Sequence, residues 1–432
     1  MMSIKDIYQV FKTSTGVCTD TRQIKKDGLF FALRGANFNG NLFASQALEH
    51  GAVKVVVDDA DVAKNENYIL VENVLATLQE LATFHRRELN IPIVGITGTN
   101  GKTTTKELVK TVLDKKYRSF ATVGNFNNHI GVPLTLLSID EKIEIAVVEM
   151  GANHPGEIDF LCKIAEPNVG LITNVGKAHL EGFGSFEGVK KTKGELYRFI
   201  ESKQGLLFVN KSNTHLLGML NSGAELFYYG HNTDCKVRVT ELRNTPNLSF
   251  GCKINEEEIH INAQLMGGYN LENALAAISV GTYFGVEPHK IAEAINEYTP
   301  ENNRSQMVIS DKNKILFDAY NANPTSMKAA LENFVALNEK NKVAILGEMK
   351  ELGDDSRQEH MKVLHFLRNK NLTDVYLVGE NYKSMLQDED GFKWADNVNV
   401  LIEEIATTPI RNSFILVKGS RSNKLELLKG IL

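Results

Sequence analysis

The sequence predicts an α/β protein of three domains. Its 432 residues correspond to about three domains at roughly 150 residues each. Apolar runs without polar alternation recur between helical stretches, which is typical of parallel sheets covered on both faces. A glycine-rich turn also joins one of these runs directly to a helix. Changes of pattern near Asn90 and Asn303 give a small N-terminal α/β domain (1–90), a central domain with a parallel sheet (91–303) and a C-terminal, Rossmann-like doubly wound domain (304–432).

The N-terminal domain is predicted from two short apolar runs and two helical stretches. Residues 28–33 and 53–57 are expected to be strands, since both runs are short and apolar. A helix is expected over 41–50, ending at Gly51 as a C-terminal cap. A second helix, over 74–88, completes this unit near Asn90.

The rest of the chain alternates predicted strands and helices. Apolar runs predict central strands at 91–97, 143–148, 169–172 and 205–209, and a helix over 270–284 that stops at Gly285. In the last third, strands are expected at 315–317, 343–346, 375–378 and 414–417. One helix has a complete start signal there, with Asn323 as its cap and Pro324 at its first position.

Composition excludes several classes of protein. With 23% charged and 43% hydrophobic residues, the chain is expected to be soluble and globular. A net charge of −5 argues against nucleic acid as the main partner. No apolar run reaches the roughly 20 residues of a membrane-spanning helix, and the N-terminus does not resemble a secretory signal. The four scattered cysteines form no metal or disulfide pattern. We expect a cytoplasmic protein without membrane insertion, and a monomer by default.

The glycine-rich turn is the strongest functional signal. It runs through Gly98, Thr99, Asn100, Gly101, Lys102, Thr103 and Thr104, between an apolar strand and a helix that continues to about Leu113. Glycines let backbone N–H groups turn toward phosphate oxygens, and the start of the helix adds a favourable potential. Lys102 is placed to bind the β- and γ-phosphates, and Thr103 to bind Mg²⁺. Although Ile96 stands where the commonest spacing has glycine, the order of strand, turn and helix predicts a nucleoside triphosphate site.

Nucleotide binding alone leaves two classes of function open. One class is a nucleotide-hydrolysing switch or motor, and the other is an enzyme that uses ATP to activate a second substrate. A switch GTPase would carry an Asn-Lys-x-Asp motif, whereas the nearest segment, 423–426, ends in Glu426.

Four further groups of polar residues follow predicted strands or lie on nearby helices. Glu149 ends an apolar strand, where a carboxylate could bind Mg²⁺ or simply face solvent. His179 ends a loop after the next strand, and Asn127 and Asn128 lie in an amide-rich segment. Lys193 has the composition of a solvated helix lysine.

Taken in order, these residues resemble the Mur ligases, the ATP-dependent enzymes that build the peptide stem of peptidoglycan. The resemblance covers essentially the whole chain. It is carried by four segments: the loop from Gly98 to Thr104, Glu149-Met150-Gly151, residues 174–179 and residues 268–274. The N-terminal segments 20–22 and 35–40 are similar to the UDP-binding domain of members that act late in the pathway. Relatives usually have Asp-Gly-His where this chain has Asn39-Gly40-Asn41.

The C-terminal motifs resemble those of the members that add D-alanyl-D-alanine. These motifs are residues 318–327, 346–353 and 417–422, and the acidic motif of the members that add diaminopimelate or lysine is absent. The resemblance implies a ligase that joins D-alanyl-D-alanine to UDP-N-acetylmuramoyl-tripeptide, through an acyl phosphate formed with ATP. A neighbouring Mur ligase with another amino acid, or a hydrolase without ligation, remains an alternative.

The resemblance also implies roles for individual residues. Thr103 and Glu149 would hold one Mg²⁺, and His179 with a carbamylated Lys193 would hold a second. Asn270 and Asn273 would face the adenine, while Arg304 and Asp318 would reach the ATP phosphate and ribose once the C-terminal domain closes on the central one. Thr21 and Arg22 would bind the UDP end. The remaining expected substrate contacts are Asn127, Asn128, Asn321, Asn323 and Arg421.

Overall fold

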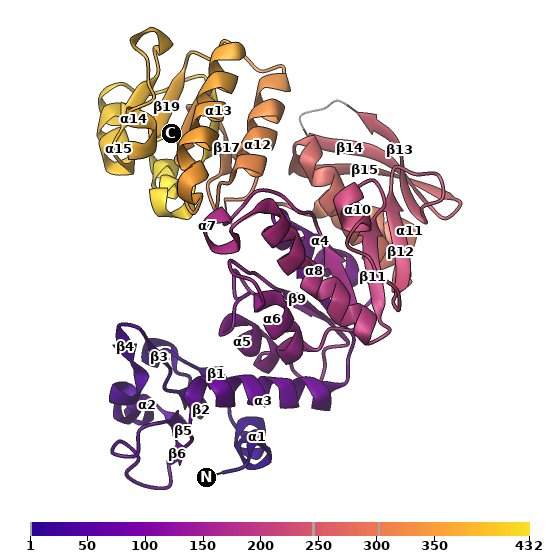
Figure 1. The fold of residues 1–432 in the computed structure, drawn as a ribbon, viewed down its shortest axis with the longest axis vertical. Helices are drawn as coiled ribbons and strands as arrows, with labels where there is room; N and C mark the ends of the chain where they lie inside the picture. The colour runs from indigo at the N-terminus through magenta and orange to yellow at the C-terminus, as the bar shows by residue number, and fades with distance from the viewer. Residues whose placement is uncertain (1, 244–246, 301–302) are drawn as a thin grey trace.

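The computed structural model describes residues 2–243, 247–300 and 303–432. Three separate parallel or mixed sheets follow one another along the chain, each covered by helices, as Figure 1 shows. The N-terminal and C-terminal sheets lie on either side of the central one in this view. This three-domain α/β architecture is the one that the sequence predicts. Among the described residues, no helix combines the length and the apolar character needed to cross a membrane.

The N-terminal sheet has four parallel strands in the order β1-β2-β5-β6. They are β1 (Val17–Cys18), β2 (Gly28–Phe31), β5 (Ala52–Val57) and β6 (Tyr68–Leu70), with a two-stranded ribbon of β3 (Arg34–Gly35) and β4 (Phe38–Asn39). Its helices are α1 (Ile4–Thr13), α2 (Ala44–Glu49) and α3 (Val74–Leu89). The helix predicted over 41–50 is shorter than expected, because its first turn (Gly40–Phe43) is a 3₁₀ helix capped by the Asn39 side chain.

The central sheet has nine strands in the order β15-β14-β13-β12-β11-β10-β7-β9-β8. Seven of its strands are parallel to one another: β7 (Ile93–Thr97), β8 (Ser119–Ala121), β9 (Ile145–Glu149), β10 (Val169–Ile172), β11 (Leu206–Asn210), β12 (Glu225–Gly230) and β13 (Val237–Arg243). Two antiparallel strands, β14 (Asn247–Ile254) and β15 (Glu257–Met266), extend it. The prediction of a parallel sheet was therefore incomplete. Strand β15 alternates buried and exposed side chains, the pattern of a strand with one solvated face.

Helices cover both faces of the central sheet. They are α4 (Lys102–Leu113), α5 (Gly131–Leu137), α6 (Glu157–Ala165), α7 (Leu180–Phe183), α8 (Phe186–Ser202), α9 (Thr214–Leu217), α10 (Leu271–Tyr283) and α11 (Pro288–Glu297). One apolar cluster includes side chains of α4, α10 and α11, and a second includes those of α5, α6 and α8. The second cluster continues into α1 and α3, so the N-terminal domain shares a core with the central domain.

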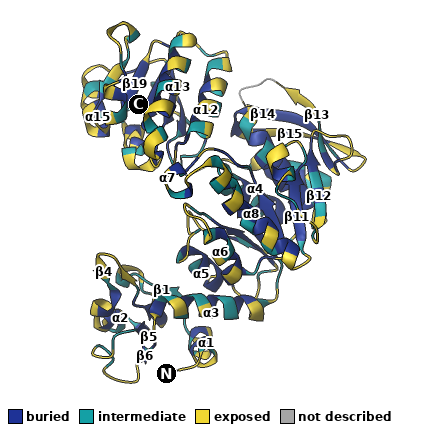
Figure 2. Ribbon diagram, in the orientation of Figure 1, coloured by how far each residue is buried: buried dark blue, intermediate teal, exposed yellow. Residues whose placement is uncertain are grey.

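The C-terminal sheet has six strands in the order β16-β17-β21-β18-β19-β20. They are β16 (Gln306–Ile309), β17 (Lys314–Asp318), β18 (Lys342–Gly347), β19 (Val375–Val378), β20 (Lys393–Ala395) and β21 (Phe414–Lys418), of which only β16 is antiparallel among the described strands. Helices α12 (Pro324–Ala336), α13 (Ser356–Asn369), α14 (Glu380–Lys383) and α15 (Val398–Thr407) cover it. Asn323 caps α12 together with Ser326, as its sequence predicts. Figure 2 shows the burial of the strands beneath these helices.

Short 3₁₀ helices complete the described elements. They are η1 (Thr21–Gln23), η2 (Gly40–Phe43), η3 (Gly268–Asn270), η4 (Gly353–Asp355), η5 (Asp388–Asp390), η6 (Arg421–Asn423) and η7 (Leu425–Gly430). The parallel topology brings the carboxyl ends of β7, β9 and β10 to one edge of the central sheet. In the C-terminal sheet, Asp318 at the end of β17 stands opposite Lys418 at the end of β21. Ligand sites of open α/β sheets form at such edges.

Candidate functional site

The glycine-rich loop lies between β7 and α4, where the sequence predicts it. Gly98 and Gly101 have φ angles of +147° and +76°, in the region that favours glycine. A Cβ atom on Gly98 would lie 2.0 Å from the Thr173 hydroxyl, and one on Gly101 would lie 2.3 Å from Asn273 Oδ1. Both positions therefore require glycine, and the loop directs the N-terminus of α4 toward the space in front of it.

The segment after β10 holds the loop in place. Thr99 N–H donates to the Asn174 carbonyl at 2.9 Å, and Asn100 N–H donates to Asn174 Oδ1 at 3.0 Å. The Asn174 amide donates in turn to the Asn100 carbonyl at 3.1 Å, and Gly176 N–H donates to Thr99 Oγ1 at 2.9 Å. Because these bonds are made within the chain, the shape of the loop is part of the fold.

Lys102 bends back over its own loop. Its Nζ donates to the carbonyls of Gly98 and Thr99 at 2.8 and 3.1 Å. Burial lowers the pKa of Lys102 below its ordinary value; Glu149 acts against this shift, and the positive charge of Arg304 adds to it. The ammonium group is thus held at the cavity by two neutral carbonyls, which a phosphate oxygen could replace.

Glu149 is the most enclosed carboxylate of the site, with 1% of the residue exposed. Its Oε2 accepts from the Thr103 hydroxyl at 2.8 Å, and its Oε1 accepts from the Asn127 amide at 2.8 Å. Its backbone N–H donates to the Thr122 hydroxyl at 3.0 Å. A hydroxyl and a buried carboxylate side by side match the oxygen ligands that Mg²⁺ prefers. No cluster of three or more His, Cys, Asp or Glu suited to a metal occurs among the described residues.

His179 and Lys193 have different surroundings from Glu149. His179 Nδ1 pairs with Glu351 of the C-terminal domain, and burial lowers the pKa of His179 below its ordinary value against the attraction of Glu351. Lys193 is 2% exposed and its Nζ lies 3.3 Å from the Ala152 carbonyl, over the Phe183 ring. Burial lowers the pKa of Lys193 well below its ordinary value, and the charge of Lys102 adds to this shift. The expectation from composition, a solvated lysine, is therefore wrong.

Glu195, two residues after Lys193, binds the start of α6. Glu195 accepts from the backbone N–H groups of Gly156 and Asp159, both at 2.9 Å. These N–H groups at the start of α6 would otherwise lack an acceptor within the helix, and a helix N-terminus favours negative charge. Both carboxylate oxygens are engaged there, which makes Glu195 a poor substitute for Lys193 as a metal ligand.

Asn270 and Asn273 lie in the same cavity but bind protein groups. The Asn270 amide donates to the Met266 carbonyl at 2.8 Å, and the Asn273 amide donates to Asn270 Oδ1 at 2.9 Å. Thr105 in α4 donates to Asn273 Oδ1 at 3.1 Å. This pair joins α10 to the loop, and any contact with adenine would come in addition to that structural role.

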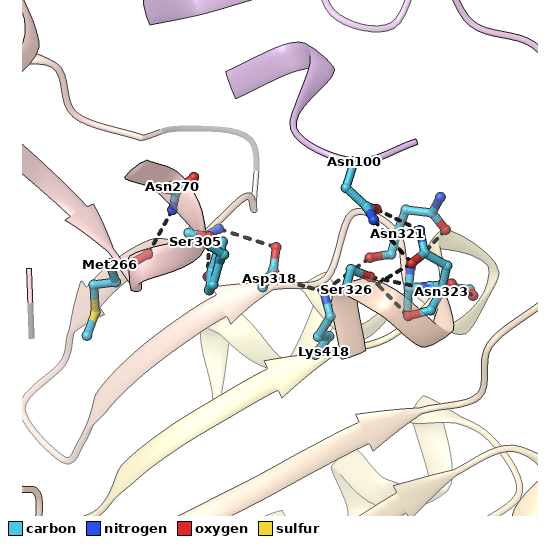
Figure 3. Close-up of polar contacts among 12 residues, drawn as sticks. Asn100, Met266, Asn270, Ser305, Asp318, Asn321, Asn323, Ser326 and Lys418 are labelled. Atoms are coloured by element: carbon cyan, nitrogen blue, oxygen red, sulfur yellow. Dashed lines mark hydrogen bonds and ion pairs between the residues drawn. The ribbon is translucent and has the colours of Figure 1, made fainter. Parts of the chain in front are cut away.

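The C-terminal domain supplies the opposite wall of the cavity (Figure 3). Lys418 Nζ donates to Asp318 Oδ2 at 2.5 Å, and Ser305 N–H lies 3.4 Å from Asp318 Oδ1. The Arg304 guanidinium stacks on the Tyr320 ring, 3.7 Å from its centroid, and the buried Arg304 Nε has no hydrogen-bond acceptor among the described residues. The unsatisfied Nε–H leaves Arg304 able to donate to an anionic oxygen.

Two amides connect the walls directly. Asn323 Nδ2 donates to Asn100 Oδ1 at 2.7 Å, in addition to capping α12 (Figure 3). Lys177 Nζ lies 3.2 Å from Glu359 Oε1 in α13. With these contacts, the C-terminal domain already faces the loop in this structure.

One cavity of about 760 Å³ collects most of the expected residues. The expected residues in its lining are Thr99, Asn100, Gly101, Lys102, Thr103, Thr104, Asn127, Asn128, Glu149, His179, Asn270, Asn273, Arg304, Asp318 and Asn321. Gly98, Lys193, Asn323 and Arg421 lie outside this lining, although Arg421 stacks over Tyr320 with its guanidinium 5.3 Å from the ring centroid. Asn128 uses its Oδ1 to cap the start of α5, accepting from Ile130 N–H and Gly131 N–H.

Thr21 and Arg22 lie apart from this cavity, in the N-terminal domain. Arg22 is paired with Asp20, and its side chain is 86% exposed. A second cavity of about 600 Å³, lined in part by Asp20, Gln23 and Phe126, lies between the N-terminal and central domains. Asn41 is buried against Asp58, donating to its Oδ1 at 2.8 Å, so this amide serves the fold of the domain.

Lys106 and Lys418 are two buried cations that the sequence reasoning did not single out. Lys418 lies in the motif 417–422, and its position opposite Asp318 depends on two strands that are 100 residues apart in sequence. Lys106 follows Lys102 by one helical turn, a spacing that could have drawn attention to it.

Comparison with known protein families matches all three parts of the chain. The "Mur ligase family, catalytic domain" matches residues 13–86, the "Mur ligase middle domain" matches residues 96–281, and the "Mur ligase, glutamate ligase domain" matches residues 303–421. Together these matches span the N-terminal sheet, the loop and the C-terminal wall of the cavity.

Individual relatives match over nearly the full length. A protein of Bacillus subtilis (strain 168) named UDP-N-acetylmuramoyl-tripeptide--D-alanyl-D-alanine ligase is 34% identical over 421 residues, covering 95% of this chain and 91% of the relative. A Haemophilus influenzae protein of the same name is 33% identical over 422 residues, covering 94% and 91%.

Solved structures show the same agreement. A crystal structure of MurF from Acinetobacter baumannii has a TM-score of 0.87 and 27% identity, covering 99% of this chain and 98% of the other. MurF ligase from Thermotoga maritima, solved in complex with ADP, has a TM-score of 0.85 and 25% identity, covering 98% and 97%.

Proposed function

This chain belongs to the Mur ligase family, and we propose that it is the ATP-dependent ligase that joins D-alanyl-D-alanine to UDP-N-acetylmuramoyl-tripeptide in peptidoglycan synthesis. The observation that carries the proposal is the single cavity in which the phosphate loop, the buried Glu149 and the C-terminal Arg304 and Asp318 face one another. A ligase of this kind must bring ATP together with its two other substrates, the UDP-linked tripeptide and the dipeptide. The name and the near-complete coverage of the relatives support the choice of substrates.

ATP is the nucleotide that the loop is proposed to bind. The backbone N–H groups at the start of α4 point toward the cavity, and Lys102 offers a positive charge for the β- and γ-phosphates. Arg304, whose buried Nε lacks an acceptor among the described residues, would hold a phosphate oxygen from the opposite wall. The relative solved with ADP supports this assignment.

The side-chain oxygens of Thr103 and Glu149 fit Mg²⁺, which would neutralise phosphate charge when bound. A second Mg²⁺ at His179 and a carbamylated Lys193 belongs to the same proposal. Carbamylation requires a neutral amine, and burial lowers the pKa of Lys193 in the direction that supplies one. Asn127 and Thr122 hold Glu149 in place through its carboxylate and its backbone N–H.

The proposed reaction has two steps. An oxygen of the terminal carboxylate of the tripeptide forms a bond to the γ-phosphorus as the bond to the ADP oxygen breaks, giving an acyl phosphate. The amine of D-alanyl-D-alanine then attacks the acyl carbon, loses a proton, and phosphate leaves. The chain contributes chiefly by positioning the reactants and neutralising charge. Lys102 and Arg304 do so from opposite walls.

The two other substrates are assigned to the outer domains. We assign the UDP end to the N-terminal domain, including Thr21 and Arg22, and the incoming dipeptide to Asn321, Asn323 and Arg421. The second cavity, which Phe126 lines in part, lies between the N-terminal and central domains. The amides of Asn127 and Asn128 reach the first cavity from the same segment, which supports a path for the tripeptide between the two.

The domain boundaries belong to the proposal as well. The proposed division is 1–90, 91–303 and 304–432, with Asn90 ending α3 in a left-handed backbone conformation at a φ of +47°. We also propose that the protein acts in the cytoplasm as a monomer.

The test is an assay of phosphate release with ATP and UDP-N-acetylmuramoyl-tripeptide. Release is expected only when D-alanyl-D-alanine is added, with single amino acids as the matched control amines. Release with another amine alone would assign the chain to a different step of the stem. Turnover without any amine would support a nucleotide hydrolase and overturn the proposal.

A further inference from the structure

Lys106 is a buried cation that the proposed reaction does not use. It lies one turn after Lys102 on α4 and is 3% exposed. Its Nζ donates to the Thr122 carbonyl at 2.7 Å and lies 3.5 Å from the Gly124 carbonyl. The nearest carboxylate oxygen, on Glu107, is 3.9 Å away. Lysine is seldom buried without a close ionic partner, because removing the ammonium from water costs free energy.

The next turn of the same helix provides a contrast. Lys110 has a side chain that is 41% exposed and forms an i,i+4 pair with Asp114. A side chain at position 106 could fill its space with carbon atoms alone, as Leu108 and Val109 do nearby. The ammonium group of Lys106 instead contacts backbone carbonyls of another segment.

That segment is the turn formed by residues 122–128, which follows β8. Its Thr122 hydroxyl accepts from Glu149 N–H at 3.0 Å, and its Asn127 amide donates to Glu149 Oε1 at 2.8 Å. The Asn127 carbonyl also accepts from Gly151 N–H at 2.7 Å. The turn therefore fixes both the backbone and the carboxylate of Glu149.

The same turn faces the cavity, whereas Lys106 does not. Asn125, Asn127 and Asn128 line the cavity of the phosphate loop, and Phe126 lines the second cavity toward the N-terminal domain. A substrate that reaches from the N-terminal domain to the phosphate loop would have to pass this turn. Any group that ties the turn to α4 would therefore set the distance between that substrate and the nucleotide.

We infer that Lys106 is a positioning residue, which fastens the turn formed by residues 122–128 to the phosphate-loop helix and so keeps Glu149 and Asn127 in register with the loop. The identity of the substrate along the turn rests on the proposed function. Burial lowers the pKa of Lys106, while Glu149 and Glu107 oppose this shift, in keeping with a cation held by carbonyls beside the site.

The direct test is hydrogen exchange in the ligand-free full-length protein. Lys106→Met keeps the length of the side chain and removes its donors, and Lys110→Met is the matched control on the same helix. Amides within 122–128 should exchange at least tenfold faster in Lys106→Met, while those of α10 and of the C-terminal sheet stay as in the wild type. Unchanged exchange within 122–128 would overturn the inference.

Kinetics supply the second measurement. In Lys106→Met, KM for the UDP-tripeptide should rise at least fivefold and clearly more than KM for ATP, because the loop is held independently by Asn174 and only the contact through Glu149 is disturbed. An equal rise of both constants would contradict a role through the turn. If the wild type shows no turnover that depends on D-alanyl-D-alanine, the proposed function fails, and the exchange measurement still decides the role of Lys106.

A folding defect is also decisive. Should Lys106→Met not fold, Lys106→Gln carries the same exchange test, since its shorter amide fits the space but does not reach the Thr122 carbonyl. If Lys106→Gln also fails to fold, or if exchange rises throughout the central domain in either variant, Lys106 serves packing in general and the inference is overturned.

Discussion

The central and C-terminal domains each supply one wall of the cavity, and the two walls are held in different ways. The loop on the central side is fixed by its own glycines and by several hydrogen bonds to the segment after β10. The C-terminal wall faces it through contacts between side chains of the two domains, such as Asn323 with Asn100 and Lys177 with Glu359. The geometry of the central wall is therefore set within its own domain. The position of the C-terminal wall depends on how the C-terminal domain packs against the central domain.

The largest effect is expected for Lys102→Ala in the central wall. Loss of the phosphate-binding charge should lower kcat/KM by about 100- to 1,000-fold, the range found when a preorganised donor is removed. The fold should persist, because Lys102 binds only carbonyls of its own loop. Steady-state kinetics and a thermal melt measure the two properties. Full ligase activity in the folded variant would refute the assignment of the loop.

Lys193→Ala should have the next largest effect. We expect a loss of roughly 100-fold in activity, the upper range for groups that orient a metal site. If the amine is carbamylated, formate or acetate should restore part of the activity, since a small carboxylate can replace the lost anion. Loss without any restoration by carboxylates, or activity at the wild-type rate, would contradict carbamylation. The control is Lys191→Ala, on the same helix but exposed.

Arg304→Ala tests the C-terminal wall. Removal of the stacked guanidinium should raise KM for ATP about tenfold, equivalent to roughly 1.4 kcal/mol of binding free energy. Arg421 also lies over the Tyr320 ring but outside the cavity lining, so Arg421→Ala should raise KM for the dipeptide and leave KM for ATP unchanged. Equal effects of both substitutions on ATP would show that stacking on Tyr320, rather than phosphate contact, explains the role of Arg304.

Glu359→Gln tests the contact between the walls and should have the smallest effect. Burial favours a raised pKa for Glu359, but the hydrogen bonds from Lys362 and Lys177 outweigh it and hold the pKa below its ordinary value of 4.5. The stabilisation is therefore present above pH 4.5 and is lost as pH falls through the lowered pKa. We expect activity at pH 7 to fall by about two- to threefold, as for a partly exposed ion pair.

The difference in thermal midpoint between the wild type and Glu359→Gln should be largest at pH 7 and should narrow below pH 4.5. Lys362→Met is the control, since it removes the partner on the same helix but leaves the bridge to Lys177. A difference that does not change with pH would mean that charge plays no part in this contact.

Ligand-dependent compaction sharpens the comparison further. The C-terminal wall already faces the loop in this structure, so saturation with an ATP analogue and UDP-tripeptide should reduce the radius of gyration, measured by solution scattering, only modestly. A large decrease would show that the free protein samples a more open arrangement in solution.

Where reasoning from the sequence succeeded, the evidence was local. The loop from Gly98 to Thr104, the capped start of α12 at Asn323 and the end of α10 before Gly285 are each determined by a few consecutive residues. Where it failed, the information was distant. The antiparallel strands β14 and β15 extend a sheet predicted to be parallel, and the burial of Lys193 against Ala152 joins segments 41 residues apart.

The sequence by itself determined the α/β class, the phosphate loop and the family resemblance, because strand–turn–helix order and glycine positions act over short stretches of chain. Only the tertiary structure decided which polar residues share one cavity. In that structure Asp318 pairs with Lys418 at the cavity, whereas Thr21 and Arg22 lie in another domain. Glu195 accepts from backbone N–H groups at the start of a helix. The tertiary structure also showed that Lys106 and Lys193 are buried. Burial and pairing depend on which strands and domains meet, and those contacts join residues that are far apart in the chain.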